Sequence, residues 1–282
     1  IETGANHPGE ITLLSNIVQA DFGLITNVGR AHLEGFGSFE GVKQTKGELY
    51  DDLYKRGKQI FLNTSDEDLV QMAIGRGFVL GKDALPYIEG VVDAVTPFVE
   101  MKWRPANVQP WRTTTTNLVG SYNIANLCAA VTIGLYFGIT LEQIDHALST
   151  YYPTNSRSEL RVAGSNRLII DAYNANPSSM AAALTNFSLM RDRHKMVILG
   201  EMRELGAESV EEHKKIVEQL QDMELERIWL VGSEFKKVAE GIRVFDDVEA
   251  VKIALKEEPI SDMTILIKGS NGTKLHQLPS LF

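Results

Sequence analysis

Two clusters of polar residues near the start of the chain combine a carboxylate, an imidazole and several glycines. Glu2 precedes the run Gly4-Ala5-Asn6-His7-Pro8-Gly9-Glu10, and His32 lies in the second cluster, residues 26–37. Carboxylate oxygens are the ligands that Mg²⁺ prefers, imidazole is a common metal ligand, and glycine lets backbone approach a ligand closely. A solvated loop would also explain each cluster, so neither is decisive alone.

Two further clusters follow along the chain. Lys43 and Lys46 are three residues apart on a predicted helix and share one face, which is also typical of a solvated helix surface. Asp171 opens the run Asp171-Ala172-Tyr173-Asn174-Ala175-Asn176-Pro177 directly after an apolar segment. Its carboxylate could accept hydrogen bonds from ribose hydroxyls, because ligands of open α/β sheets bind beyond the carboxyl ends of the strands. Asn-rich turns are also common without any function.

The phosphate-binding sequence Gly-x-x-x-x-Gly-Lys-Ser/Thr is absent from the 282 residues. Gly81-Lys82 is followed by Asp83, and Gly269-Ser270-Asn271-Gly272-Thr273-Lys274 has its residues in the wrong order. The chain opens at Ile1-Glu2-Thr3-Gly4 without a Met, which we interpret as the mark of a fragment, or of truncation or processing.

Short apolar segments alternate with helical patterns, which predicts an α/β fold with mostly parallel strands and right-handed crossovers. The predicted strands are Phe22–Thr26, Ile60–Leu62, Phe78–Leu80, Leu168–Asp171, Met196–Leu199, Ile228–Val231 and Thr264–Ile267. The predicted helices are Glu10–Gln19, Phe39–Lys55, Asp66–Ile74, Ser121–Phe137, Leu141–Ser149, Ser178–Arg191, Val210–Met223, Glu234–Ile242 and Val248–Leu255. Residues 87–116 carry three prolines among alternating runs and predict a small β-rich insertion.

The polar turn residues at 151–156 predict a domain boundary, with one domain over residues 1–154 and a second over 155–282.

The net charge of −9, from 28 Lys and Arg against 37 Asp and Glu, argues against a general nucleic-acid binder. The single cysteine, Cys128, excludes an intramolecular disulfide and fits a reducing cytoplasm. No apolar stretch reaches the roughly 18 residues of a membrane-spanning helix, so we expect no membrane insertion.

Taken together and in order, these clusters resemble the Mur ligase family, most closely the members that add D-alanyl-D-alanine. The segments that carry the resemblance are Glu2–Ile11, Ile25–Gly37, Gly120–Asn126, Asp171–Pro177 and Leu199–Gly206 with His213. The resemblance covers essentially the whole chain. It implies a UDP-sugar-binding N-terminal domain that is missing here, then the remainder of a central P-loop-type ATPase domain with a mostly parallel sheet and a small β insertion. A C-terminal Rossmann-like α/β domain would follow.

The resemblance also implies an ATP-dependent amide ligase that uses Mg²⁺. ATP would phosphorylate the terminal carboxylate of UDP-N-acetylmuramoyl tripeptide, and the amine of D-Ala-D-Ala would attack the resulting acyl phosphate. Glu2, His32 and Lys46 would be Mg²⁺ ligands, with Lys46 carbamylated by CO₂. Arg157 would reach the ATP phosphates. Lys46, His32 and Arg157 would thus be the catalytic residues.

The same resemblance implies the nucleotide and substrate contacts. Asn123 and Asn126 would lie by the adenine, Asp171 by the ribose, and Asn176 would help to shape the site. Lys268-Gly269-Ser270 would face the incoming amine.

Three alternatives stay open. The first two are a sibling ligase that adds a diamino acid and a folylpolyglutamate synthase. The third is a non-catalytic binding fragment, which the missing phosphate-binding loop favours for this polypeptide. We expect this chain alone to be inactive, and the enzyme to be a cytoplasmic monomer without a nucleic-acid partner.

Overall fold

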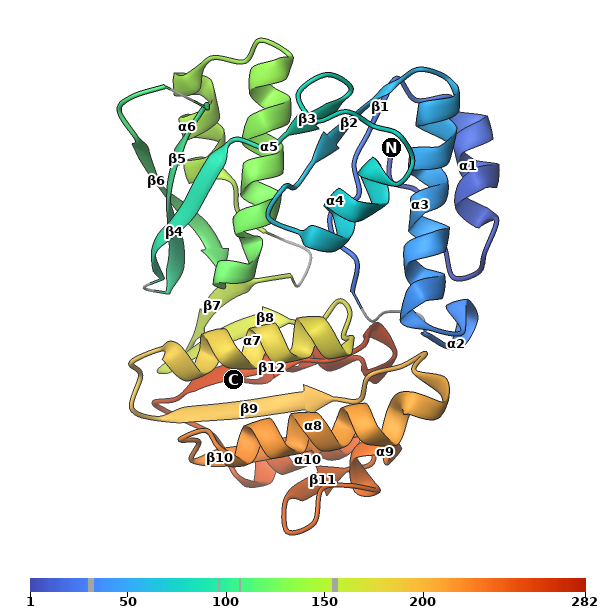
Figure 1. The fold of residues 1–282 in the computed structure, drawn as a ribbon. Coiled ribbons are helices and arrows are strands. Elements are labelled where there is room, and N and C mark those ends of the chain that lie inside the picture. The colour runs from blue at the N-terminus through green and yellow to red at the C-terminus, as the bar shows by residue number, and fades with distance from the viewer. Residues whose placement is uncertain (30–32, 96, 107, 154–156) are drawn as a thin grey trace. The chain divides into compact units, whose positions relative to one another are not determined.

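The computed structural model describes residues 1–282 except 30–32, 96, 107 and 154–156 (Figure 1). The described part forms two compact units. The first comprises residues 1–93, 101–114 and 123–149, and the second comprises residues 94–100, 115–122 and 150–282. The domain boundary expected at residues 154–155 lies outside the described residues and stays a prediction.

The first unit is built on a parallel sheet in the order β1-β2-β3, with β1 (Phe22–Gly23), β2 (Gln59–Leu62) and β3 (Ala84–Pro86). Its helices are α1 (Glu10–Val18), α2 (Leu33–Phe36), α3 (Phe39–Lys55), α4 (Glu67–Ile74), α5 (Ile124–Tyr136) and α6 (Leu141–Thr150). The 3₁₀ turn η1 (Ser121–Asn123) precedes α5, and its first two residues belong to the second unit. Helix α3 buries Tyr50 and Leu53 against Ile60 and Leu62 of β2, because side chains at helical spacing share one face.

Two strand predictions in this unit need correction. Strand β1 is shorter than Phe22–Thr26, since only Phe22 and Gly23 pair with β2. Phe78–Leu80 is not a strand, because residues 79–83 close into a turn in which the Asp83 carboxylate accepts a hydrogen bond from the Val79 amide at 2.5 Å. Gly81 has a φ of +79°, which favours glycine in this turn.

A separate three-stranded sheet in the order β4-β5-β6 confirms the predicted β insertion. Its strands are β4 (Glu89–Val95), β5 (Phe98–Arg104) and β6 (Arg112–Val119). Alternate residues of β5 are buried, and among them the Trp103 indole donates a hydrogen bond to Thr114 Oγ1 at 2.9 Å. Period-two burial is expected of a strand with one covered face.

The second unit contains a six-stranded sheet in the order β11-β10-β9-β12-β8-β7. Its strands are β7 (Glu159–Ala163), β8 (Asn166–Asp171), β9 (Lys195–Gly200), β10 (Arg227–Val231), β11 (Arg243–Phe245) and β12 (Thr264–Lys268). Only β7 runs antiparallel to its neighbour. The arrangement confirms the expected α/β fold with a Rossmann-like second sheet.

Helices cover both faces of this sheet, as strands buried on both sides require. The helices are α7 (Pro177–Leu189), α8 (Ser209–Gln221), α9 (Ser233–Lys236) and α10 (Val248–Glu257), with 3₁₀ segments η2 (Gly206–Glu208), η3 (Asn271–Thr273) and η4 (Leu275–Leu281). Helix α10 and η4 pack with the side chains of one face, and α7 and α8 lie side by side (Figure 1). The predicted helix Glu234–Ile242 is wrong in extent, because α9 ends at Lys236.

Candidate functional site

The carboxyl ends of β8 and β12 bring a buried ion pair to one edge of the second sheet. Lys268 and Asp171 are register partners on these strands. Lys268 Nζ donates to Asp171 Oδ2 at 2.6 Å and to the Asn174 carbonyl at 3.2 Å. The Lys268 side chain is only 1% exposed and Asp171 is 13% exposed, so the ammonium depends on these two acceptors. Lys268, expected to face an amine substrate, is therefore engaged by Asp171.

Asn176 begins helix α7. Its Oδ1 accepts a hydrogen bond from the Ser179 amide at 2.9 Å, and the Ser179 hydroxyl accepts one from the Asn176 amide at 3.1 Å. Pro177 occupies the first helical position, where its missing N–H costs nothing. The Asn-rich turn thus fixes the start of α7 beside Asp171. The expected roles of Asp171 and Asn176 toward a nucleotide stay predictions.

Arg157 and Tyr173 form a cation–π pair in the second unit. The guanidinium carbon lies 4.0 Å from the centre of the Tyr173 ring. Both side chains are exposed, so the stacking orients the guanidinium without burying its charge. An oriented, exposed guanidinium is suited to binding a phosphate, which is the role expected for Arg157.

The segment expected beside the adenine, residues 120–126, divides between the two units. In the second unit, the Ser121 amide and hydroxyl both donate to Asn186 Oδ1, at 2.9 and 2.6 Å, and the Tyr122 hydroxyl is hydrogen-bonded to Ser158 at 2.9 Å. In the first unit, Asn123 is buried at the start of α5. Asn126 is exposed three residues later. The adenine role of these two asparagines stays a prediction.

The two lysines of α3 have different surroundings. Lys46 Nζ donates to the Asn27 carbonyl at 2.7 Å, and burial lowers the pKa of Lys46 despite the opposing charge of Asp66. Lys43 instead lies 2.5 Å from Asp68, and this carboxylate raises the pKa of Lys43. The sequence placed both on one face, but only Lys46 is biased toward the neutral amine.

Two carboxylates order the loop that follows Glu2. Glu48 of α3 accepts hydrogen bonds from the amides of Gly9 and Thr12, at 2.7 and 2.9 Å, and from the Thr12 hydroxyl. Glu10 accepts from two amides of the same loop, residues 6 and 7. Sequence reasoning did not assign Glu48 this role, since the two segments are 36 to 39 residues apart.

The predicted metal ligands are only partly covered by the structure. Glu2 is exposed, Lys46 is half-buried, and His32 lies outside the described residues. Among the residues that are described, no three His, Cys, Asp or Glu side chains converge in a way that could hold a metal ion. The predicted set of Glu2, His32 and Lys46 stays a prediction, because His32 lies outside the described residues and Lys46 is not one of these four residue types.

In the same described part, every helix falls short of the length and apolar character that a bilayer crossing requires.

The edge near Lys268 depends on glycines that leave no room for a side chain. A Cβ on Gly269 would lie 3.0 Å from Gly200 Cα and 2.7 Å from Thr273 Oγ1. We expect Gly269→Ala to lower the free energy of unfolding by about 1–3 kcal/mol, since the backbone of β9 cannot yield easily. Urea denaturation would measure this. Gly4→Ala, whose Cβ would meet nothing within 4 Å, is the control and should change stability by less than about 0.5 kcal/mol. Equal effects of the two changes would contradict the expectation.

Comparison with known proteins relates both parts of the chain to one family. The Mur ligase middle domain matches residues 1–134, and the domain described as Mur ligase, glutamate ligase domain matches residues 156–271. The UDP-N-acetylmuramoyl-tripeptide–D-alanyl-D-alanine ligase of Bacillus subtilis (strain 168) is 30% identical over 299 residues. That alignment covers 99% of this chain and 62% of the relative, so the chain spans less than two thirds of the relative's length.

Solved structures of MurF proteins are similar to this chain in fold. MurF from Acinetobacter baumannii is 26% identical, with a TM-score of 0.81 over 98% of this chain and 62% of that one. The MurF ligase from Thermotoga maritima in complex with ADP is 21% identical, with a TM-score of 0.83 over 100% of this chain and 66% of that one. The second likeness supports the fold alone.

Proposed function

Because the chain belongs to the Mur ligase family and carries its middle and C-terminal domains, we propose that it is the larger part of a D-alanyl-D-alanine-adding ligase. The observation that carries the proposal is the 30% identity, over 99% of the chain, to a relative named for that reaction. The acceptor would be UDP-N-acetylmuramoyl tripeptide, and the product a precursor of peptidoglycan. The enzyme would act in the cytoplasm as a monomer.

The proposed reaction has two steps. The tripeptide carboxylate takes the γ-phosphoryl group of ATP, which gives an acyl phosphate and ADP. The amine nitrogen of D-Ala-D-Ala then attacks the acyl carbon, so that the C–N bond forms, the bond to the phosphate oxygen breaks, and the amine loses a proton. Both steps gather anionic groups, so the site must supply positive charge.

Residues of this chain would contribute to that charge balance in different ways. Arg157, held against Tyr173, would contact the ATP phosphates, and the Asp171 carboxylate, with Oδ2 held by Lys268, would accept hydrogen bonds from the ribose. Lys46 fits carbamylation, because only a neutral amine reacts with CO₂ and burial favours that form. Mg²⁺, when bound, would neutralise phosphate charge, and Glu2, His32 and carbamylated Lys46 would hold it.

The choice of amine distinguishes this proposal from its alternatives. The complete gene product should be assayed for ATP-dependent amide formation with D-Ala-D-Ala, with diaminopimelate or lysine, and with glutamate, each with its matching acceptor. We expect product only with D-Ala-D-Ala and the UDP-muramoyl tripeptide. Product with a diamino acid would identify a sibling ligase, and glutamate addition to a folate would identify a folylpolyglutamate synthase.

The 282-residue chain should not hydrolyse ATP by itself, because it contains no Gly-x-x-x-x-Gly-Lys-Ser/Thr sequence to cradle the phosphates. Phosphate release would be measured with ATP, Mg²⁺, tripeptide and D-Ala-D-Ala. The complete gene product serves as the positive control. Phosphate release by the isolated chain above the background without protein would refute this expectation.

A further inference from the structure

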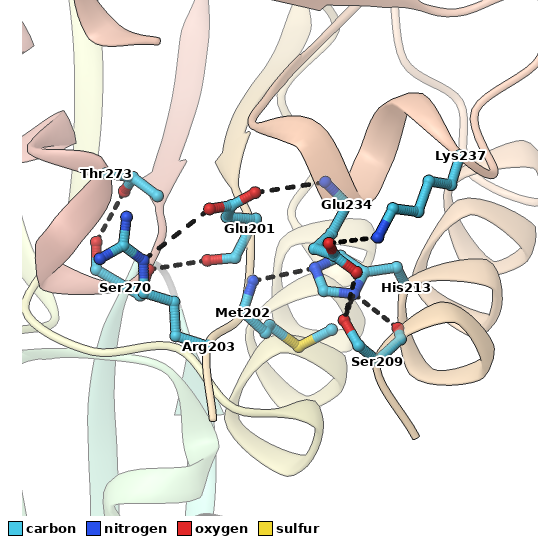
Figure 2. A network of polar contacts seen from close by, with 9 residues as sticks. All are labelled: Glu201, Met202, Arg203, Ser209, His213, Glu234, Lys237, Ser270 and Thr273. Atoms are coloured by element: carbon cyan, nitrogen blue, oxygen red, sulfur yellow. Dashed lines mark hydrogen bonds and ion pairs between the residues drawn. The ribbon is translucent and has the colours of Figure 1, made fainter. Parts of the chain in front are cut away.

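A polar network links helix α8 to the loop after β9, which we call the β9 loop (residues 201–205). Figure 2 shows His213 of α8 directed at the main chain of this loop, with Ser209 and Glu234 beside it. His213 Nε2 accepts a hydrogen bond from the Met202 amide at 3.0 Å. His213 Nδ1 lies 2.7 Å from the Ser209 carbonyl, to which it donates. The Phe235 ring packs edge-on against the imidazole, with ring centres 4.7 Å apart.

These contacts require one protonation state of His213. An imidazole that donates through Nδ1 and accepts through Nε2 is the neutral Nδ1–H tautomer. The side chain is 0% exposed, so a second proton would be buried and would break the bond to the Met202 amide. Burial accordingly lowers the pKa of His213, against the opposing charges of Glu234 and Glu201, while Lys237 acts in the same direction as burial.

The proximity of a serine, a histidine and a glutamate does not make a nucleophilic triad. The Ser209 hydroxyl donates to Glu234 Oε2 at 2.6 Å, so its proton is directed away from the imidazole. Glu234 in turn accepts a hydrogen bond from Lys237 at 2.5 Å. With both His213 nitrogens bound to main-chain groups, the imidazole holds backbone and has no free nitrogen to act as a base.

The β9 loop is tied on its other side to the segment after β12. Ser270 Oγ donates to the Glu201 carbonyl at 2.8 Å, and Thr273 Oγ1 donates to the Ser270 carbonyl at 2.6 Å (Figure 2). The Glu201 carboxylate accepts from the Glu234 amide at 3.2 Å. Ser270 follows the Lys268 that binds Asp171, so the network continues to the carboxyl edge of the sheet.

Arg203 is the cation that this loop presents. Its side chain is 56% exposed and lies 3.8 Å from a Glu201 carboxylate oxygen. A Cβ on Gly272 would be 2.2 Å from Arg203 Nη1, so the guanidinium lies directly against the backbone after β12. The next residue, Glu204, has a φ of +62°, a conformation that a non-glycine residue keeps only when its surroundings hold it.

We propose that His213 is a positioning residue, which in its neutral form fixes the β9 loop through the Met202 amide and so sets Arg203 and the Ser270 contact at the carboxyl edge. The effect on catalysis rests on the proposed ligase function, whereas the effect on the loop does not. The proposal has a pH dependence with a definite sign. Above the ordinary histidine pKa of 6.5, His213 is neutral and the stabilisation by its hydrogen bond to the Met202 amide is fully present. Because the pKa of His213 is lower in the folded state, a released loop lets His213 take up a proton as pH falls below 6.5. The stabilisation is therefore lost as pH falls from 6.5 through the lower pKa of the folded state.

The test compares His213→Asn with His213→Gln in the 282-residue chain. The Asn amide reaches the position of Nδ1 but not that of Nε2, whereas the Gln oxygen can still accept from the Met202 amide. At pH 8 we expect trypsin to cut after Arg203 about tenfold faster in His213→Asn, which corresponds to about 1.4 kcal/mol of lost loop stability. Trypsin should cut His213→Gln at a rate between those of the wild type and His213→Asn. His194→Asn is the matched control, since His194 is exposed and pairs with Glu226.

Below pH 6.5 the ratio of variant to wild-type cleavage rates should fall toward one, because wild-type His213 then also releases the loop. Unchanged cleavage after Arg203 in His213→Asn, or a ratio that stays constant with pH, would overturn the proposal. In the complete ligase, His213→Asn should raise the KM for the amine at least tenfold and leave the KM for ATP unchanged. An unchanged amine KM would overturn the catalytic part, whereas an inactive wild-type enzyme would refute the proposed function and leave the cleavage result standing.

Discussion

Asp171→Ala is expected to lower the free energy of unfolding of the second unit by about 3–5 kcal/mol, because it leaves the Lys268 ammonium buried without a counter-charge. Lys268 is 1% exposed, and its remaining acceptor is the Asn174 carbonyl at 3.2 Å. A single neutral carbonyl does not replace the water that a buried ammonium has lost. Urea denaturation, monitored by hydrogen exchange in peptides that contain β8, β9 and β12, would measure the change in the free energy of unfolding of this unit.

Lys268→Met provides the matched comparison. Methionine fills a similar volume, and the Asp171 carboxylate, at 13% exposure, can recover some hydration. We therefore expect Lys268→Met to destabilise less than Asp171→Ala. The double variant should be more stable than Asp171→Ala alone, because it removes the stranded charge. Additive losses in the double variant would show that the two side chains do not depend on each other.

The central strands of the second sheet could be predicted because each is buried on both faces. Strand β9 is buried along its whole length, and such a strand shows as a continuous apolar run. Strand β7, at the sheet edge, carries Glu159 and Arg161 and pairs on one side only, so its sequence lacks that pattern. Strand β11 has three residues, too few for any periodicity to be recognised.

The motif residues could be found from sequence, but their partners could not. For Lys268, the family resemblance implies a contact with substrate, yet its partner Asp171 is 97 residues away. The two side chains meet only because β12 lies next to β8, and the local sequence pattern does not predict the order of strands in a sheet. His213 shows the same limit, because its hydrogen bond joins helix α8 to the Met202 amide 11 residues earlier, in a loop with no regular secondary structure.

Lys46→Ala is expected to reduce turnover of the complete ligase by about 10²–10³-fold, the range found when one group that stabilises transition-state charge is removed. The proposed carbamate would turn a cation into an anion that can bind Mg²⁺. Removing dissolved CO₂ should therefore lower wild-type turnover and leave the residual rate of Lys46→Ala unchanged. With ¹³C-labelled bicarbonate, NMR should show a carbamate carbon in the wild type that is missing from Lys46→Ala.

Lys43→Ala tests whether the effect is specific to Lys46, since both lysines lie on one face of α3. Asp68 raises the pKa of Lys43 and keeps it protonated, whereas burial lowers the pKa of Lys46 toward the form that reacts with CO₂. Lys43→Ala should therefore retain both the carbamate signal and most of the turnover, because it loses only a partly exposed ion pair with Asp68. If the carbamate signal disappeared in Lys43→Ala and persisted in Lys46→Ala, the modified residue would be Lys43, and the proposal for Lys46 would be wrong. Full turnover of Lys46→Ala would remove the case for a carbamate at this position, because alanine cannot be carbamylated.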